Sequence, residues 1–326
     1  MLKWLSWLLV VGLLAWVLAQ VPLREAAAIV AGLRGWQVGA WLAVNGLVLW
    51  VLNGRWWLIL RAQGYAVPYL RLLGHRLAGF GVSYFTPGPQ FGGEPVQVLL
   101  LSRKEGVPRA TAVAVITLDK LLELLFSFLF LVGGVLIVLQ GRLFGGVVGW
   151  ETAVFAFILL LFPAAFLTAT GLGWYPVTKL LRGMGHWSMW ARRPLWHSRY
   201  QRLAQFGMDS EAQMTAFFRT APRTLLVVLA VSVCSWLLLL FEYALMLRFL
   251  GLTVTWMQVV GLLTAVRVAF LLPLPAGLGM VEASQVLALS LMGLNPAVGI
   301  SASLLIRARD VLLGLAGLAW WRLNWG

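Results

Sequence analysis

Two segments that interrupt apolar helices lie 188 positions apart in this chain and align without a gap. The aligned identities are Pro87 with Pro275, Glu94 with Glu282, Gln97 with Gln285, Val98 with Val286, Ser102 with Ser290, and Pro108 with Pro296. Paired Pro/Gly breaks at corresponding positions of two halves are typical of the central binding site of membrane transporters. We therefore expect a duplicated membrane carrier.

The composition agrees with a membrane protein. Hydrophobic residues make up 61% of the chain and charged residues 11%, whereas a typical soluble domain has roughly 25% charged residues. The net charge of +14 comes from basic residues at the ends of apolar runs, where the positive-inside rule and anionic lipid headgroups account for them. We therefore expect no nucleic-acid partner.

Apolar stretches predict an all-α polytopic fold with about six full spans and two re-entrant hairpins. The stretches cover residues 36–60, 77–102, 110–140, 150–172, 223–250, 257–292 and 297–321, after an apolar run over residues 1–21. That first run is long enough to cross a hydrocarbon core of about 30 Å. We expect it to be a retained helix, and a cleaved secretory signal is the alternative.

Loop charges predict the orientation. Residues 173–223 contain eight basic and two acidic residues, so this segment should be cytoplasmic, with both termini on the same side of the cell inner membrane. Basic residues flank residues 77–102 at both ends, which favours a hairpin that enters and leaves on one face. One continuous span with a kink at Pro87 is the alternative. By the same reasoning, residues 257–292 form a hairpin that enters from the outer face.

We therefore predict one domain over residues 1–326, built from two inverted repeats. Repeat 1 covers about 36–140 and repeat 2 about 223–321, and each consists of a helix, a re-entrant hairpin and a helix. The basic loop between them, about 173–223, should contain one or two interfacial helices, because tryptophans lie among its arginines. The hairpin tips should include Pro87, Gly88, Gly92, Gly93, Pro275, Gly277 and Gly279.

Charged residues inside apolar stretches predict the functional site. Asp119, Lys120 and Glu123 lie near the middle of a predicted helix, where three charges facing lipid would cost about 8–10 kcal/mol. They should face one another or a wet cavity. Arg307 lies at the position of repeat 2 that corresponds to Asp119, so we expect a carboxylate–guanidinium pair that closes a central cavity. The alternative is a static bridge between the halves.

Further charges extend this candidate site. Glu94 and Glu282 lie in the first helical turn after each break, where a carboxylate caps a helix and where N–H groups also bind anions. Arg267 and Arg307 are candidate phosphate ligands, with Glu242 as their expected counter-ion. The candidate substrate-binding residues are Glu94, Asp119, Lys120, Glu123, Glu242, Arg267, Glu282, Arg307 and Asp310.

Several motifs together point to a known family. They are Arg55 to Leu60, Pro87 through Gly93-Glu94 to Arg103, Gly106-Val107-Pro108, Asp119-Lys120 with Glu123, and Pro275 to Gly279 with Glu282. From about residue 4 to 321, the chain resembles the lysylphosphatidylglycerol synthase transmembrane-region family of uncharacterised multi-pass proteins, which includes the flippase portion of bifunctional lysyl-lipid synthases. The family usually has Pro-Gly-Gly at the first hairpin tip, whereas this chain has Pro87-Gly88-Pro89. In addition, Pro95 follows the acidic residue Glu94.

The resemblance implies a lipid flippase that moves a phosphate-containing lipid across the membrane. An anionic or zwitterionic phospholipid or a polyprenyl phosphate would fit, with no cofactor and no metal, and an oligomer is compatible with the sequence. We expect no synthesis, because the sequence ends at Gly326 before any aminoacyl-transferase domain. A membrane-embedded lipid-modifying transferase and an accessory subunit of an envelope enzyme are the alternatives.

Cysteine labelling tests the predicted topology. In a Cys234→Ser background, a cysteine that replaces Lys104 should react with a membrane-impermeant reagent only from the cytoplasmic side. Labelling of position 104 from outside intact cells would contradict the re-entrant hairpin and the inverted repeats.

Overall fold

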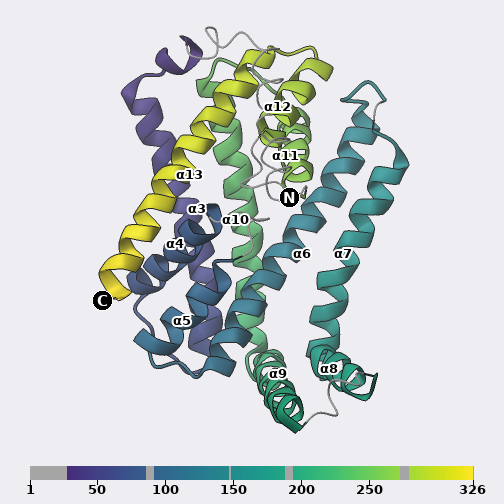
Figure 1. The fold of residues 1–326 in the computed structure, drawn as a ribbon. Coiled ribbons are helices and arrows are strands. Elements are labelled where there is room, and N and C mark those ends of the chain that lie inside the picture. The colour runs from purple at the N-terminus through teal and green to yellow at the C-terminus, as the bar shows by residue number, and fades with distance from the viewer. Residues whose placement is uncertain (1–27, 86–91, 147, 188–193, 272–278, 326) are drawn as a thin grey trace.

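The computed structural model describes residues 28–85, 92–146, 148–187, 194–271 and 279–325, and these residues form helices and short connections without strands. Figure 1 shows the arrangement. The helices are α3 Gly35–Ala62, α4 Tyr69–Phe85, α5 Glu94–Lys104, α6 Arg109–Gly141, α7 Trp150–Gly171, α8 Pro176–Trp187, α9 Pro194–Thr220, α10 Pro222–Phe249, α11 Trp256–Leu271, α12 Met280–Leu291 and α13 Pro296–Trp325. The prediction of an all-helical protein is confirmed.

Four of the described helices have the length and composition of membrane spans: α3, α6, α7 and α10. Their exposed surfaces are apolar, as on α7, where Phe155, Ile158 and Phe162 face outward. α13 is also long, with 30 residues, but it contains several charged residues. The protein is therefore a membrane protein with several apolar helices. The predicted span over residues 1–21 lies outside the described residues.

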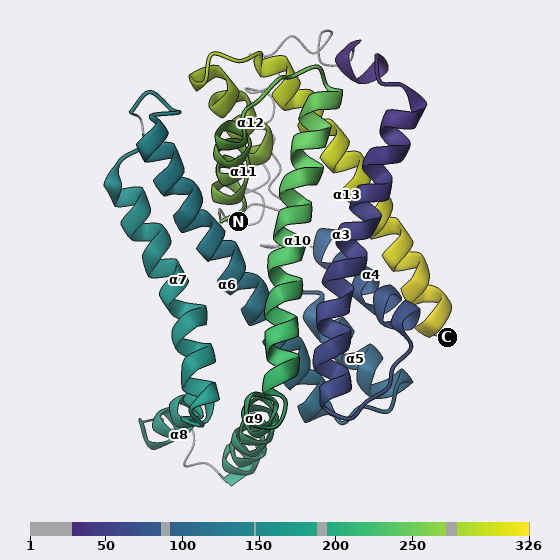
Figure 2. The ribbon, with the colours of Figure 1, turned by 180° about the vertical axis from the view of Figure 1, so that it is seen from behind.

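Two pairs of shorter helices accompany the long ones. α4 and α5 lie side by side in the lower half of the molecule, and α11 and α12 lie in the upper half (Figures 1 and 2). The four helices contain 17, 11, 16 and 12 residues. At 1.5 Å per residue they extend about 16–26 Å, less than a hydrocarbon core of about 30 Å.

Glycines directly precede the second helix of each pair. Gly92 and Gly93 precede α5 and Gly279 precedes α12, and Gly92 and Gly279 have φ angles of 152° and 78°. Residues with a side chain rarely adopt such angles, so glycine is favoured at both positions. The other predicted tip residues, Pro87, Gly88, Pro275 and Gly277, lie outside the described residues.

The first short pair begins earlier than the apolar pattern predicted. α4 starts at Tyr69 rather than near residue 77, so Arg71 and Arg76 lie within a helix and not in a basic linker. Pro68 directly precedes the helix, and its carbonyl accepts a hydrogen bond from the Leu72 amide. The apolar pattern missed this first part because arginines that form ion pairs are compatible with a helix at this depth.

Glycines allow the short helices to pack closely against the long ones. A Cβ added to Gly317 of α13 would lie 1.9 Å from the carbonyl oxygen of Leu77 in α4. Likewise, a Cβ on Gly134 of α6 would lie 2.0 Å from Oγ1 of Thr264 in α11. Small residues let membrane helices approach closely enough for extensive van der Waals contact. α4 thereby packs on α13, and α11 packs on α6.

The basic loop forms two helices, α8 and α9, at the lower end of the molecule (Figure 1). The Glu211 carboxylate of α9 accepts hydrogen bonds from the amides of Val177 and Thr178 at the start of α8, at 2.7 and 2.9 Å. These amides have no partner within their own helix, so Glu211 caps α8 and fixes it to α9.

Replacement of Gly317 tests this close packing. Gly317→Val should destabilise the protein by about 1–3 kcal/mol, because the added atoms overlap the backbone of α4. Thermal unfolding in detergent would measure the change. Gly133→Ala in α6, where an added Cβ meets nothing within 4 Å, is the matched control and should unfold like the parent. An unchanged Gly317→Val protein would contradict the packing.

Candidate functional site

Asp119 of α6 is held by two arginines. Its Oδ1 lies 2.7 Å from Nε of Arg55 in α3, and its Oδ2 lies 2.8 Å from Nη2 of Arg76 in α4. Arg55 is 1% exposed and also donates to the Asp119 carbonyl at 3.1 Å. Two guanidiniums on one carboxylate leave one positive charge in excess. This cluster joins three helices of the first half.

Lys120, the next residue of α6, contacts two carboxylates. Its Nζ lies 3.6 Å from Glu94 at the start of α5 and 3.3 Å from Glu123 one turn along α6. The side chains of Lys120, Glu94 and Glu123 are 28%, 27% and 45% exposed. Charged groups exposed near the middle of a membrane helix require water or a polar ligand. The cluster is therefore an accessible polar surface inside the membrane region.

Glu94 has two roles at once. Its carboxylate accepts a hydrogen bond at 3.0 Å from the amide of Gly92, which lies before the first turn of α5. The same carboxylate binds Lys120. The break before α5 is held further by the Gly93 amide, which donates to the Ser83 hydroxyl of α4 at 2.8 Å. Glu94 thus fixes the helix start and connects it to α6.

An equivalent ion pair lies in the second half. Glu282 in the first turn of α12 accepts from Nε of Arg307 in α13 at 3.0 Å. Glu282 is the repeat counterpart of Glu94, and Arg307 lies one position from the counterpart of Lys120. In both halves, then, a carboxylate directly after a helix break binds a cation of the next long helix.

A third cluster connects α3, α10 and α13. Glu242 of α10 accepts hydrogen bonds from the Trp41 indole and, at 3.0 Å, from the Asn45 amide. Arg309 of α13 lies 3.7 Å from Glu242 and 2.9 Å from its neighbour Asp310, and it also donates to Asn45 at 2.8 Å. α13 is thereby connected to α3 and α10.

Arg267 of α11 has a different environment. Its guanidinium lies 4.8 Å from the ring centroid of Trp236 in α10, and that ring stacks on Phe130 of α6. Within the part of the chain that the structure describes, Arg267 makes no ion pair, and its Nε is buried without a hydrogen-bond partner. It is a cation that the described residues do not neutralise.

The ion pairs differ from those that the sequence predicted. Asp119 binds Arg55 and Arg76, and not Arg307. The predicted counter-ion of Arg267 and Arg307, Glu242, binds Arg309. Asp310 also binds Arg309, its immediate neighbour, rather than Arg307 one turn away. The alignment of the two segments could not show which charged side chains lie close together in space.

Sequence reasoning missed several residues of these clusters. Arg55 and Asn45 are polar residues within an apolar helix, the same signal that marked Asp119, and both are buried. Arg76 was assigned to a linker. Trp41 had no signal beyond its type, because most tryptophans in such a chain lie at membrane interfaces.

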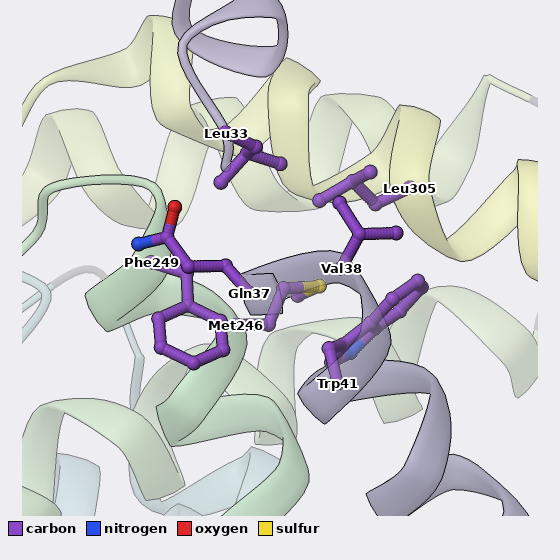
Figure 3. A pocket seen from close by; sticks show the side chains of 7 residues that line it. All are labelled: Leu33, Gln37, Val38, Trp41, Met246, Phe249 and Leu305. Carbon is purple, nitrogen blue, oxygen red and sulfur yellow. The ribbon is translucent and has the colours of Figure 1, made fainter. Parts of the chain in front are cut away.

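An apolar pocket lies beside the third cluster (Figure 3). Its wall includes Trp41, whose indole binds Glu242, together with side chains from α3, α10 and α13. The lining residues are Leu33, Gln37, Val38, Trp41, Met246, Phe249 and Leu305. The pocket is small and apolar, and no charged side chain lines it.

Long apolar helices, broken short helices and internal ion pairs define a multi-pass membrane protein with a charged interior. The sequence profile described as "Lysylphosphatidylglycerol synthase TM region" matches residues 3–317, and the chain belongs to this family. Similarity also extends to the UPF0104 membrane protein MJ1595 of Methanocaldococcus jannaschii, with 29% identity over 90 residues, which is 27% of each protein. No solved structure matches the chain.

Neutralisation of Asp119 tests the first cluster. Asp119→Asn leaves the buried Arg55 and Arg76 without a carboxylate and should destabilise the protein by about 3–5 kcal/mol. Glu123→Gln on the same helix removes an exposed carboxylate and should cost less than about 1 kcal/mol. Thermal unfolding of both variants in one detergent compares them. Equal unfolding temperatures would show that Asp119 does not stabilise the bundle.

Proposed function

We propose that this protein is a lipid translocase that moves a phosphate-containing lipid across the cytoplasmic membrane by alternating access. The observation that carries the proposal is the equivalent placement of two ion pairs, Glu94 with Lys120 and Glu282 with Arg307. Family membership supports a lipid-related role. Each pair connects the second half of a broken helix to the following long helix, so breaking one pair would release one half of the protein.

The arrangement of the short helices supports an inverted repeat with re-entrant hairpins. Both pairs consist of helices shorter than the bilayer core, and they lie in opposite halves of the molecule (Figure 2). α4 packs on α13 of the other repeat, and its counterpart α11 packs on α6. Two such hairpins would meet near the midplane, where half-helix N-termini form the binding site of many transporters.

The accessible charges support a wet site for the lipid headgroup. Lys120 and Arg267 are cations near the breaks that could contact a phosphate, while the acyl chains remain in the bilayer beside the apolar helix surfaces. In an alternating cycle, each carboxylate would release its cation while that half opens and bind it again on closure. Glycerophospholipids and polyprenyl phosphates both carry the required phosphate.

Charge also supports an orientation. The lower end of the molecule contains α8 and α9 with most of the loop arginines (Figure 1). Positive-inside statistics place such an end on the cytoplasmic side. In this orientation the α4–α5 pair opens from the cytoplasm and the α11–α12 pair from the outer side.

A transferase and an accessory subunit remain the competing functions, and one assay separates the three. Purified protein in vesicles that contain a fluorescent phospholipid should accelerate movement of that lipid between leaflets, measured by quenching of the outer leaflet. The amount and chemical identity of the lipid should stay constant. A change in lipid mass would identify an enzyme, and no change in either quantity would favour an accessory role.

Substitution of the two cations tests the mechanism. Lys120→Gln and Arg307→Gln should each reduce lipid movement to the background rate, because a phosphate loses a charged ligand and the cycle loses one closing pair. Lys120→Gln should largely retain its folding, since Glu94 and Glu123 are partly exposed. Arg307→Gln leaves the buried Glu282 carboxylate without this partner, so it should also lower the stability. Exposed Arg248 of α10 offers a matched control, and Arg248→Gln should transport like the parent.

A charge exchange separates transport from mere bridging. The double variant Glu282→Arg with Arg307→Glu retains an ion pair between α12 and α13 but reverses the field at the helix start. We expect a folded protein without lipid movement. Transport at the parental rate would show that this pair only holds the helices together.

A further inference from the structure

The connection between α7 and α8 exposes apolar side chains directly beyond a membrane span. α7 has the length and composition of a span and ends at Gly171. Leu172 and Trp174 follow it and are 61% and 59% exposed, and Leu180 in α8 is 65% exposed. Tryptophan is enriched at the level of the lipid headgroups, where its ring contacts apolar groups and its N–H stays hydrated. These side chains therefore lie at the boundary between membrane and water.

Backbone geometry fixes the direction of α8. Gly173 and Tyr175 have φ angles of 77° and 49°, and the chain changes direction sharply there. The Glu211 carboxylate of α9 then holds the start of α8 through the amides of Val177 and Thr178 and, at 2.6 Å, the Thr178 hydroxyl. As a result, α8 lies across the lower end of α7 and does not continue it (Figures 1 and 2). A helix held in this way stays close to the membrane boundary.

α8 has two different faces. One face packs on α9, where Thr178 is buried and a Cβ added to Gly207 would lie 3.3 Å from Leu181. Lys179 and Leu180 are exposed on the other side of the helix. An amphipathic helix with exposed apolar and basic residues at a membrane boundary is typical of helices that lie in the headgroup layer.

Two cations lie beside the exposed apolar side chains. Nζ of Lys179 lies 5.8 Å from the ring centroid of Trp174, within the range of a cation–π contact. A Cβ added to Gly173 would lie 3.0 Å from Nη2 of Arg219, so this guanidinium of α9 lies against the turn. Both cationic residues are exposed. No carboxylate in the described parts of the chain forms an ion pair with either of them.

The acidic residues of this region do not cancel the positive charge. Residues 173–223 contain eight basic and two acidic residues, an excess of six positive charges. Glu211 is 3% exposed and accepts its hydrogen bonds from the start of α8, and Asp209 accepts one from Gln205. Charge complementarity therefore favours a negatively charged partner, and the position at the end of a span favours a partner within the bilayer.

We infer that Leu172, Trp174, Lys179, Leu180 and Arg219 form a binding surface for anionic phospholipids in the leaflet at this end of the molecule. Lys179 contacts the headgroup phosphate as a point charge, and Arg219 contacts it through its planar donors. Trp174 and the two leucines contact the glycerol region and the upper acyl chains. This α7–α8 surface includes none of the helix breaks and ion pairs of the candidate site, so the inference goes beyond the proposed translocation and does not depend on it.

The net charge of the headgroup should decide which lipids gather at the α7–α8 surface. A zwitterionic phospholipid also has a phosphate, but its ammonium group opposes the attraction by the two cations. Each Lys or Arg near an anionic membrane surface contributes about 1 kcal/mol, which corresponds to an association constant about fivefold higher. The preference should fall in 1 M salt, where the Debye length is about 3 Å.

Fluorescence quenching at one position tests the inference. In a Cys234→Ser protein, a fluorophore attached at Leu180→Cys would be combined with vesicles that contain nitroxide-labelled phospholipid. The nitroxide lies near the ester end of an acyl chain, and the headgroup is either anionic glycerol or zwitterionic choline. The anionic lipid should show a relative association constant at least about fivefold higher. The double variant Lys179→Gln with Arg219→Gln should reduce this ratio to about one.

The matched control is Lys104→Gln with Arg109→Gln, two exposed basic residues at the end of α5 and the start of α6. It removes the same charge and should preserve the parental ratio. Thermal unfolding of both double variants confirms that they are folded. A parental ratio of about one, or an unchanged ratio in the variant at positions 179 and 219, would overturn the lipid surface. Weak quenching by both lipids would also overturn it, and would show that water, a second copy or another protein contacts Leu180.

Discussion

The free-energy cost of placing a charged side chain inside a bilayer is the main constraint on this structure. A charged side chain at the centre of a membrane helix costs several kcal/mol unless it is neutralised or hydrated. The chain nevertheless contains Arg55, Asp119 and Arg307 well within its long helices. Each of these is bound to an opposite charge from another helix. The ion pairs thereby determine which helices must be neighbours.

Close packing between helix backbones stabilises the arrangement together with the ion pairs. Ion pairs orient the helices relative to one another. Extensive van der Waals contact between helices also requires small residues at the crossing points. Gly317 and Gly134 provide these contacts for α4 on α13 and for α11 on α6. The short helices are thus fixed by packing, α4 on α13 and α11 on α6, and by ion pairs, α5 to α6 and α12 to α13.

Much of the fold could be predicted because apolar length and helix breaks are local features. The predicted stretch 110–140 corresponds to α6, which is one residue longer at each end, and α4 and α11 end at Phe85 and Leu271, just before the predicted hairpin tips. The predicted start of α4 was wrong because hydropathy counts Arg76 as polar. The ion pair of Arg76 with Asp119 allows this arginine to lie inside the helix bundle.

The partners within the site were harder to predict, because they depend on how helices rotate against one another. Sequence alignment of the repeats placed Arg307 opposite Asp119, but the real partner of Arg307 is Glu282. The equivalence of Glu94 and Glu282 was visible in the sequence, while their cations became clear only from the geometry. Arg55 was visible as a charge in an apolar helix, and its buried position shows that such residues should all be included among the candidates.

Distance measurements at both ends of the molecule test the alternating cycle most directly. In a Cys234-free protein, spin labels at positions 104 and 223 report on the end of α5 and the start of α10, and labels at 36 and 290 report on α3 and α12. Double electron–electron resonance spectroscopy in lipid nanodiscs would measure the distance within each pair of labels. The account predicts that Glu94→Gln lengthens only the first distance and Glu282→Gln only the second. Distances that stay constant, or that lengthen together in either variant, would contradict it.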